Sequence, residues 1–120
     1  MFPKGEAAAD RAKRKADLRA LDRKESRAVK LRSDGQCEVV FSDTGGRCSR
    51  RATEVHHMLG RGREAGPWMK PEYKQHVCAG PTGHHLMITG DIGGKRLKLV
   101  QEGDVPLWTD RYERVRSDPT

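Results

Sequence analysis

The chain has 120 residues, of which 34% are hydrophobic and 34% are charged, and its mean hydropathy is −0.87. So short and polar a chain builds one domain with a small core, and no apolar stretch is long enough to cross a membrane. The first twenty residues lack the apolar run of a secretory signal, so we expect a cytoplasmic protein.

The positive charge is concentrated at the N-terminus. Residues 1–32 hold eleven Lys/Arg against five Asp/Glu and so carry +6 of the net charge of +7. A basic segment of this kind attracts nucleic acid by neutralising phosphates, although acidic lipid and simple solubility are competing explanations. We therefore expect a nucleic-acid partner.

The first predicted element is a long helix over residues 6–32. This segment is rich in Ala, Leu, Lys, Arg and Glu, has no Pro or Gly, and ends at a Ser-Asp-Gly sequence. Its apolar stripe is thin, so only the C-terminal half is expected to pack on a core while the N-terminal half projects. Residues 1–32, which we call the arm, are either a solvated charged helix or a DNA-binding element. In the second case Lys13, Arg14 and Lys15 contact DNA.

The next predicted element is a hairpin that ends at a histidine pair. Residues 36–41 form a β-rich run, a glycine turn follows, and the chain returns through residues 52–57. Residues 58–72 contain three glycines and two prolines and predict a long loop, which in a small domain is often functional.

The remaining segments predict short elements. Residues 73–77 indicate a strand and residues 84–89 a short helix. In the tail, residues 96–100 alternate as a half-buried strand does, and residues 108–116 predict a helical turn or two. The predicted organisation is therefore an arm (1–32), a core (33–92) and a C-terminal strand with a short helix that packs on the core (93–120).

Four residues form a candidate structural metal site. Cys37 and Cys48 flank one predicted turn, and Cys78 and His84 flank another. Tetrahedral zinc accepts three cysteines and a histidine, and a domain with so few apolar residues usually needs such reinforcement. The alternative is three buried free cysteines without a metal.

The histidines are unusually clustered. Four of the five stand in two adjacent pairs, His56-His57 and His84-His85. Together with the Ser-Asp-Gly-Gln-Cys sequence of residues 33–37 and the Gly-Arg-Gly-Arg loop of residues 60–63, they resemble the HNH endonuclease family, in particular its small free-standing bacteriophage type. The resemblance extends over residues 29–89.

This resemblance implies an α+β protein with a zinc-stapled ββα-metal core and a long basic N-terminal helix. It implies a DNA endonuclease that hydrolyses phosphodiester bonds by a one-metal mechanism and leaves 5′-phosphate and 3′-hydroxyl ends. His57 would be the general base, and His56 and His85 would hold a catalytic divalent cation, which is Mg, Mn, Ni or Zn. Arg61 and Arg63, on the loop, suit the clamping of phosphate oxygens.

The sequence departs from the family pattern at two points. The middle asparagine of the family corresponds to Tyr73 or to His76, so His76 is a further candidate catalytic residue. His84 stands where a fourth cysteine is usual, and the roles of His84 and His85 are interchangeable at this stage. These departures motivate an alternative function, a catalytically weak or inactive zinc-stapled nucleic-acid-binding module. The resemblance also suggests work beside a phage packaging or replication machine, and it leaves the oligomeric state open.

Overall fold

The N-terminal part of the chain forms the long helix that its composition predicts. The computed structural model describes residues 7–116, and α1 occupies Ala8–Ser33. The predicted helix start at residue 6 lies outside the described residues. Asp34 follows in a left-handed conformation (φ 52°), which ends the helix at the predicted place. Its buried residues, Ser26, Val29 and Ser33, all lie in its C-terminal half, the half that the sequence predicts to pack on a core.

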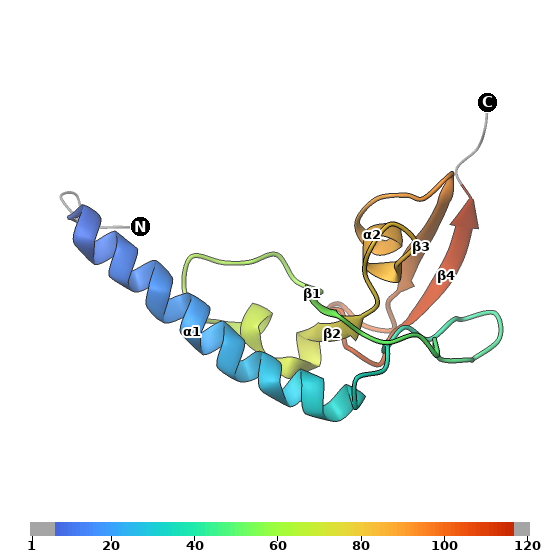
Figure 1. Ribbon diagram of the computed structural model, residues 1–120, viewed down its shortest axis with the longest axis horizontal. Coiled ribbons are helices and arrows are strands. Elements are labelled where there is room, and N and C mark those ends of the chain that lie inside the picture. Colours follow the sequence, from blue (N-terminus) through green and yellow to red (C-terminus); the bar gives the residue numbers. More distant parts are fainter. Residues whose placement is uncertain (1–6, 117–120) are drawn as a thin grey trace.

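Shorter elements follow α1 in the described part of the chain (Figure 1). They are the strands β1 (Glu54–His57), β2 (Lys74–Val77), β3 (Lys95–Val100) and β4 (Arg111–Arg116), the helix α2 (His84–Thr89), and the 3-10 helices η1 (Pro67–Met69) and η2 (Pro71–Tyr73). β1 pairs antiparallel with β2, and β3 pairs antiparallel with β4. The protein is therefore an α+β fold, and none of its described helices is both long and apolar enough to span a membrane.

The partner of β1 differs from the prediction. The sequence predicts pairing between residues 52–57 and 36–41, whereas β1 pairs with β2, so that His57 lies opposite Lys74. Residues 36–51, which we call the curled segment, form an antiparallel hairpin through the bridges Gln36–Arg51 and Val40–Arg47, so its second strand lies before residues 52–57. This segment carries both of its cysteines into the core.

The C-terminal segment is a strand, so the prediction of a helical turn over residues 108–116 is wrong. β4 supplies the partner that β3 requires, with Leu99 opposite Tyr112. Tyr112 also exchanges backbone hydrogen bonds with the curled segment: its N–H donates to Val40 and its carbonyl accepts from Ser42, each at 2.8 Å. Pairing on two sides outweighs the helical preference of a short charged segment.

The core is small and includes the cysteines. A single cluster of buried side chains joins the curled segment, the end of β2 and the β3–β4 hairpin. Its members are Cys37, Val39, Cys48, Val77, Cys78, Leu97 and Tyr112. The C-terminal hairpin therefore shares the core of residues 37–78.

β2 is buried although three of its four residues are polar, and each of these side chains has partners. The amide of Gln75 donates to the carbonyl of Trp108 at 2.9 Å and accepts from the hydroxyl of Tyr112 at 2.5 Å. Lys74 is fully buried against α1. Because unpartnered buried polar groups are costly, these bonds fix the position of β2 between α1 and the C-terminal hairpin.

Candidate functional site

Three cysteines and one histidine converge in the core. The sulfurs of Cys37, Cys48 and Cys78 and a ring nitrogen of His84 all lie within 4.8 Å of one another. The cysteines are buried and unpaired by disulfides. The protein can therefore hold a metal ion such as zinc here, as the sequence predicts, because these are the ligand types of tetrahedral structural zinc sites.

The turn before α2 is shaped to present two of these ligands. The backbone N–H of His84 donates to the sulfur of Cys78 at 3.2 Å. Gly83 lets this turn close, because a Cβ at that position would lie 2.4 Å from the backbone of Ala79. A donor aimed at the sulfur stabilises a thiolate, so the turn suits a metal-bound cysteine.

Protonation of the four ligands is governed by burial. Burial raises the pKa of the Cys37 thiol to about 12 and also raises the pKa of Cys48. Burial lowers the pKa of His84, with the positive charges of Arg50 and Arg114 acting in the same direction. A metal ion must therefore displace protons from thiols but meets a neutral imidazole, so metal affinity falls as the pH falls.

His85, the next residue, belongs to a different group. Its ring centroid lies 5.3 Å from that of His56, and its Nδ1 is hydrogen bonded to the carboxylate of Glu54. Burial lowers the pKa of His56 to about 4, helped by the charges of His85 and His57. A neutral imidazole such as His56, beside an imidazole oriented by a carboxylate such as His85, suits the binding of a divalent cation. The structure thus separates His84 from His85, which the sequence left interchangeable.

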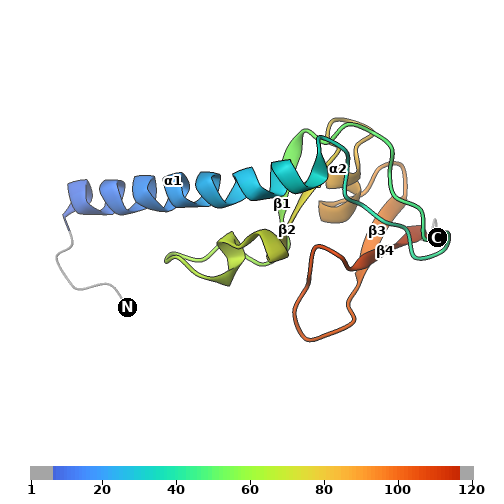
Figure 2. The ribbon, with the colours of Figure 1, turned by 90° about the horizontal axis from the view of Figure 1, so that it is seen from below.

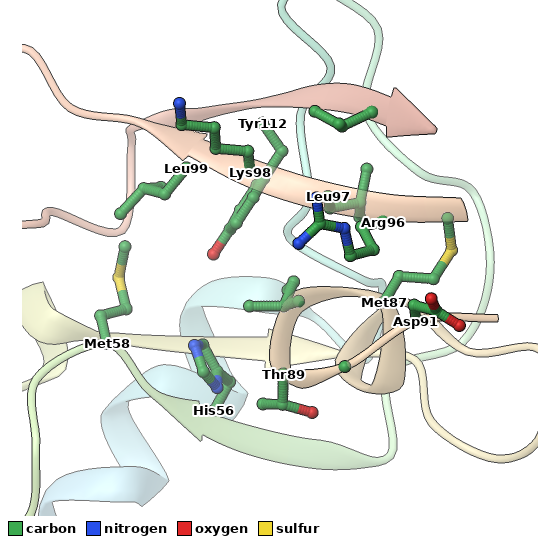
Figure 3. Close-up of a pocket in the computed structure, with 13 residues that line it drawn as sticks. His56, Met58, Met87, Thr89, Asp91, Arg96, Leu97, Lys98, Leu99 and Tyr112 are labelled. Atoms are coloured by element: carbon green, nitrogen blue, oxygen red, sulfur yellow. The ribbon is translucent and has the colours of Figure 1, made fainter. Parts of the chain in front are cut away.

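A cavity of about 690 Å³ opens beside His56, between β1, α2 and the β3–β4 hairpin. In Figure 3 the His56 ring points into this cavity and Arg96 lies on the opposite wall, whereas the Lys98 amine points away from His56. Met58, Met87 and other apolar side chains form much of the lining. An anion bound near His56 would therefore face the Arg96 guanidinium across the cavity.

His57 points to the other face of the sheet, toward α1. Its Nε2 lies 3.0 Å and 3.1 Å from the two carboxylate oxygens of Asp22, and its Nδ1 lies 3.3 Å from a guanidinium nitrogen of Arg61. Burial lowers its pKa; Asp22 opposes this shift, whereas the charges of Arg61 and Lys74 add to it. Successive strand residues face opposite sides, so His56 and His57 do not share one cavity. A phosphate that contacts both must lie across the end of β1.

A second cavity, of about 320 Å³, lies between α1 and the arginine-bearing loop. The two segments run side by side in both ribbon views (Figure 2). The charged side chains that line this cavity are Arg14, Lys15, Arg19, Asp22, Arg61 and Arg63. We call it the cationic groove. It unites four of the five predicted DNA contacts, whereas Lys13 lines a separate hollow on α1.

The two candidates for the middle asparagine of the family lie elsewhere. His76 is buried, and its Nδ1 lies 2.7 Å from the hydroxyl of Ser33, about three helical turns along α1 from Asp22. The structure therefore gives His76 a packing role and does not place it with His56 and His85. Tyr73 uses its carbonyl to accept from the N–H of Met58 at 2.8 Å, and this bond braces the start of the loop.

Sequence reasoning missed three residues that hold the site: Asp22, Glu54 and Lys74. Their signals are weak, because charged residues are common in this chain. The strand predicted at residues 73–77 could have pointed to them. Its polar side chains, if buried in so small a core, require hydrogen-bonding partners from other segments. Neither a family model, nor a curated protein, nor a solved structure matches this chain.

Proposed function

We propose that this protein is a metal-dependent DNA endonuclease with a ββα-metal core of the HNH type. The observation that carries the proposal is the facing pair of imidazoles, His56 from β1 and His85 from α2, beside a Cys3His group. Because His84 and His85 are adjacent at the start of α2, the candidate zinc ligands and the imidazole pair lie next to each other. The cationic groove supports nucleic acid as the substrate.

His56 and His85 are suited to hold a divalent cation. The lowered pKa keeps His56 neutral at physiological pH, and the contact of Glu54 with Nδ1 of His85 leaves Nε2 as the nitrogen that would bind the cation. When bound, such a cation supplies charge stabilisation to the scissile phosphate and the departing oxygen. Two protein ligands leave room for phosphate oxygens and water.

His57 acts as the general base in this proposal. Its Nδ1 takes a proton from a water molecule, whose oxygen forms the new bond to phosphorus as the bond to the 3′ oxygen breaks. Arg61 donates to Nδ1 in the free protein. A phosphate is a stronger acceptor for a guanidinium than a neutral imidazole is, so bound DNA draws Arg61 away and opens Nδ1 to water. The products carry 5′-phosphate and 3′-hydroxyl ends.

A second function, a zinc-stapled DNA-binding module without catalysis, is favoured by one observation. The His57 side chain is 11% exposed and both of its nitrogens are engaged, by Asp22 and by Arg61. If Arg61 stays on Nδ1 when DNA binds, no water can be activated there. The groove then binds DNA and the chain cuts nothing.

A nicking assay separates the two functions. Zinc-loaded wild type and His57→Ala are incubated with supercoiled plasmid and with Mg²⁺, Mn²⁺, Ni²⁺ or Zn²⁺ in turn. Nicking by wild type, with a loss of about 10²-fold or more in His57→Ala, is expected. The matched control is Arg27→Ala, an exposed arm residue that lines neither the cavity nor the groove. If wild type binds DNA but does not nick it with any of these cations, the endonuclease proposal is wrong and the DNA-binding module is favoured.

A further inference from the structure

The carboxylate of Asp22 joins the N-terminal arm to the proposed base. Asp22 lies in the middle of α1, 35 residues before His57, and both of its oxygens are within 3.1 Å of Nε2. The two side chains are 17% and 11% exposed, so water competes little for this contact. The contact is therefore a defined pair and not a loose surface ion pair.

Asp22 is itself held by Lys74. The Lys74 ammonium is fully buried and donates to Asp22 Oδ1 at 2.5 Å, to the Asp22 carbonyl at 3.1 Å and to the Ser26 hydroxyl at 3.0 Å. These three acceptors use all three of its protons. A buried ammonium left without its carboxylate is strongly destabilising, so Asp22 cannot leave this position cheaply.

The two contacts of the His57 ring agree on one proton arrangement. A carboxylate only accepts, so Nε2 must carry the proton. A guanidinium only donates, so Nδ1, which faces Arg61, must present its lone pair. The lone pair consequently faces the loop that lines the cationic groove.

We infer that Asp22 is a positioning residue that holds His57 in the Nε2–H tautomer with Nδ1 directed toward the groove. This inference rests on the proposed function, and it changes the role of the arm. α1 does not only grip DNA, since it also completes the active site from 35 residues away. Deletion of residues 1–20 would keep the Asp22–His57 pair, and a deletion that also removes Asp22 would lose it.

The test compares two full-length zinc-loaded variants with wild type. Lys74→Met removes the ammonium and keeps the carboxylate. The double variant Asp22→Leu/Lys74→Met removes both, and replacing an ion pair by apolar side chains of similar size is often neutral for folding. The double variant thus removes the carboxylate without stranding a buried charge. Asp17→Asn, an exposed aspartate of α1, is the matched control for the arm.

The first readout is the tautomer of His57, measured from imidazole ¹⁵N shifts at about pH 8, where the ring is neutral. Wild type, Asp17→Asn and Lys74→Met are expected to show Nε2–H alone, and the double variant a mixture. The same pure Nε2–H signature in the double variant overturns the inference. This readout needs no catalysis, so it stands even if wild type cuts no DNA and the proposed function fails.

The second readout is nicking kinetics with the divalent cation that supports wild-type activity. The double variant is expected to lose about 10²- to 10⁴-fold in kcat with KM unchanged, because the phosphate contacts remain. Asp17→Asn is expected to match wild type. If the double variant has a higher KM and an unchanged kcat, the positioning role is wrong and Asp22 contributes to substrate binding instead. An unchanged kcat overturns it as well.

Discussion

Removal of the metal from the Cys3His group should unfold the domain at moderate temperature. Of the seven side chains in the buried core cluster, three are the cysteine ligands, so the ion would hold together the segments that meet in this core. A ligand at about 1,000 times its dissociation constant stabilises the folded state by about 4 kcal/mol. For 120 residues, the unfolding entropy is about 0.25 kcal/mol per kelvin, so this loss lowers Tm by about 16 °C.

The assay is thermal unfolding followed by circular dichroism, with and without a chelator, together with metal content per chain. Wild type should bind one zinc through this group and lose about 16 °C on chelation. Cys37→Ser should bind less zinc and respond little to the chelator, because one of four ligands is gone. His85→Ala is the matched control, since it alters the neighbouring histidine and leaves the Cys3His group intact. An unchanged Tm after complete chelation of wild type would refute the reasoning.

Other predictions follow from single contacts. Burial raises the pKa of Asp22, but the hydrogen bonds and charges of Lys74 and His57 outweigh burial, so the net pKa is lowered. The ionised carboxylate therefore stabilises the fold at pH values above its ordinary pKa, and this stabilisation is lost as the pH falls through the lowered pKa. Asp22→Asn should thus lower the free energy of unfolding, measured with urea at neutral pH, by about 3 kcal/mol. The difference between wild type and variant should become smaller below about pH 4, and a difference that does not change with pH contradicts the prediction. Gly83→Ala should reduce zinc content and Tm, whereas Gly103→Ala, where a Cβ meets open space, should not; equal effects would argue against the tight turn. Arg63→Ala should reduce the slope of log K against log salt for DNA by about 0.9, and exposed Lys24→Ala should leave it unchanged; equal slopes exclude the groove as the phosphate contact.

Residue chemistry made the structural metal site predictable. Cysteines and histidines are the protein ligands that zinc prefers, and a chain with so little apolar material has few other ways to stabilise a core. The helix at residues 8–33 and the strand at residues 95–100 were predictable for a similar reason, since composition and alternation are local properties. The strand at residues 111–116 was not, because its conformation depends on two distant partners.

The ligand types, the charge of the arm and the clustering of the histidines follow from the sequence alone. Only the packed fold decides which of His84 and His85 joins the cysteines, and that Asp22 meets His57. The reason is that both relations depend on contacts between segments far apart in the sequence, with separations of 35 residues between Asp22 and His57 and 47 between Cys37 and His84. Local periodicity gives the face of a helix or strand on which a residue lies, and only the packing of the elements gives what that face touches.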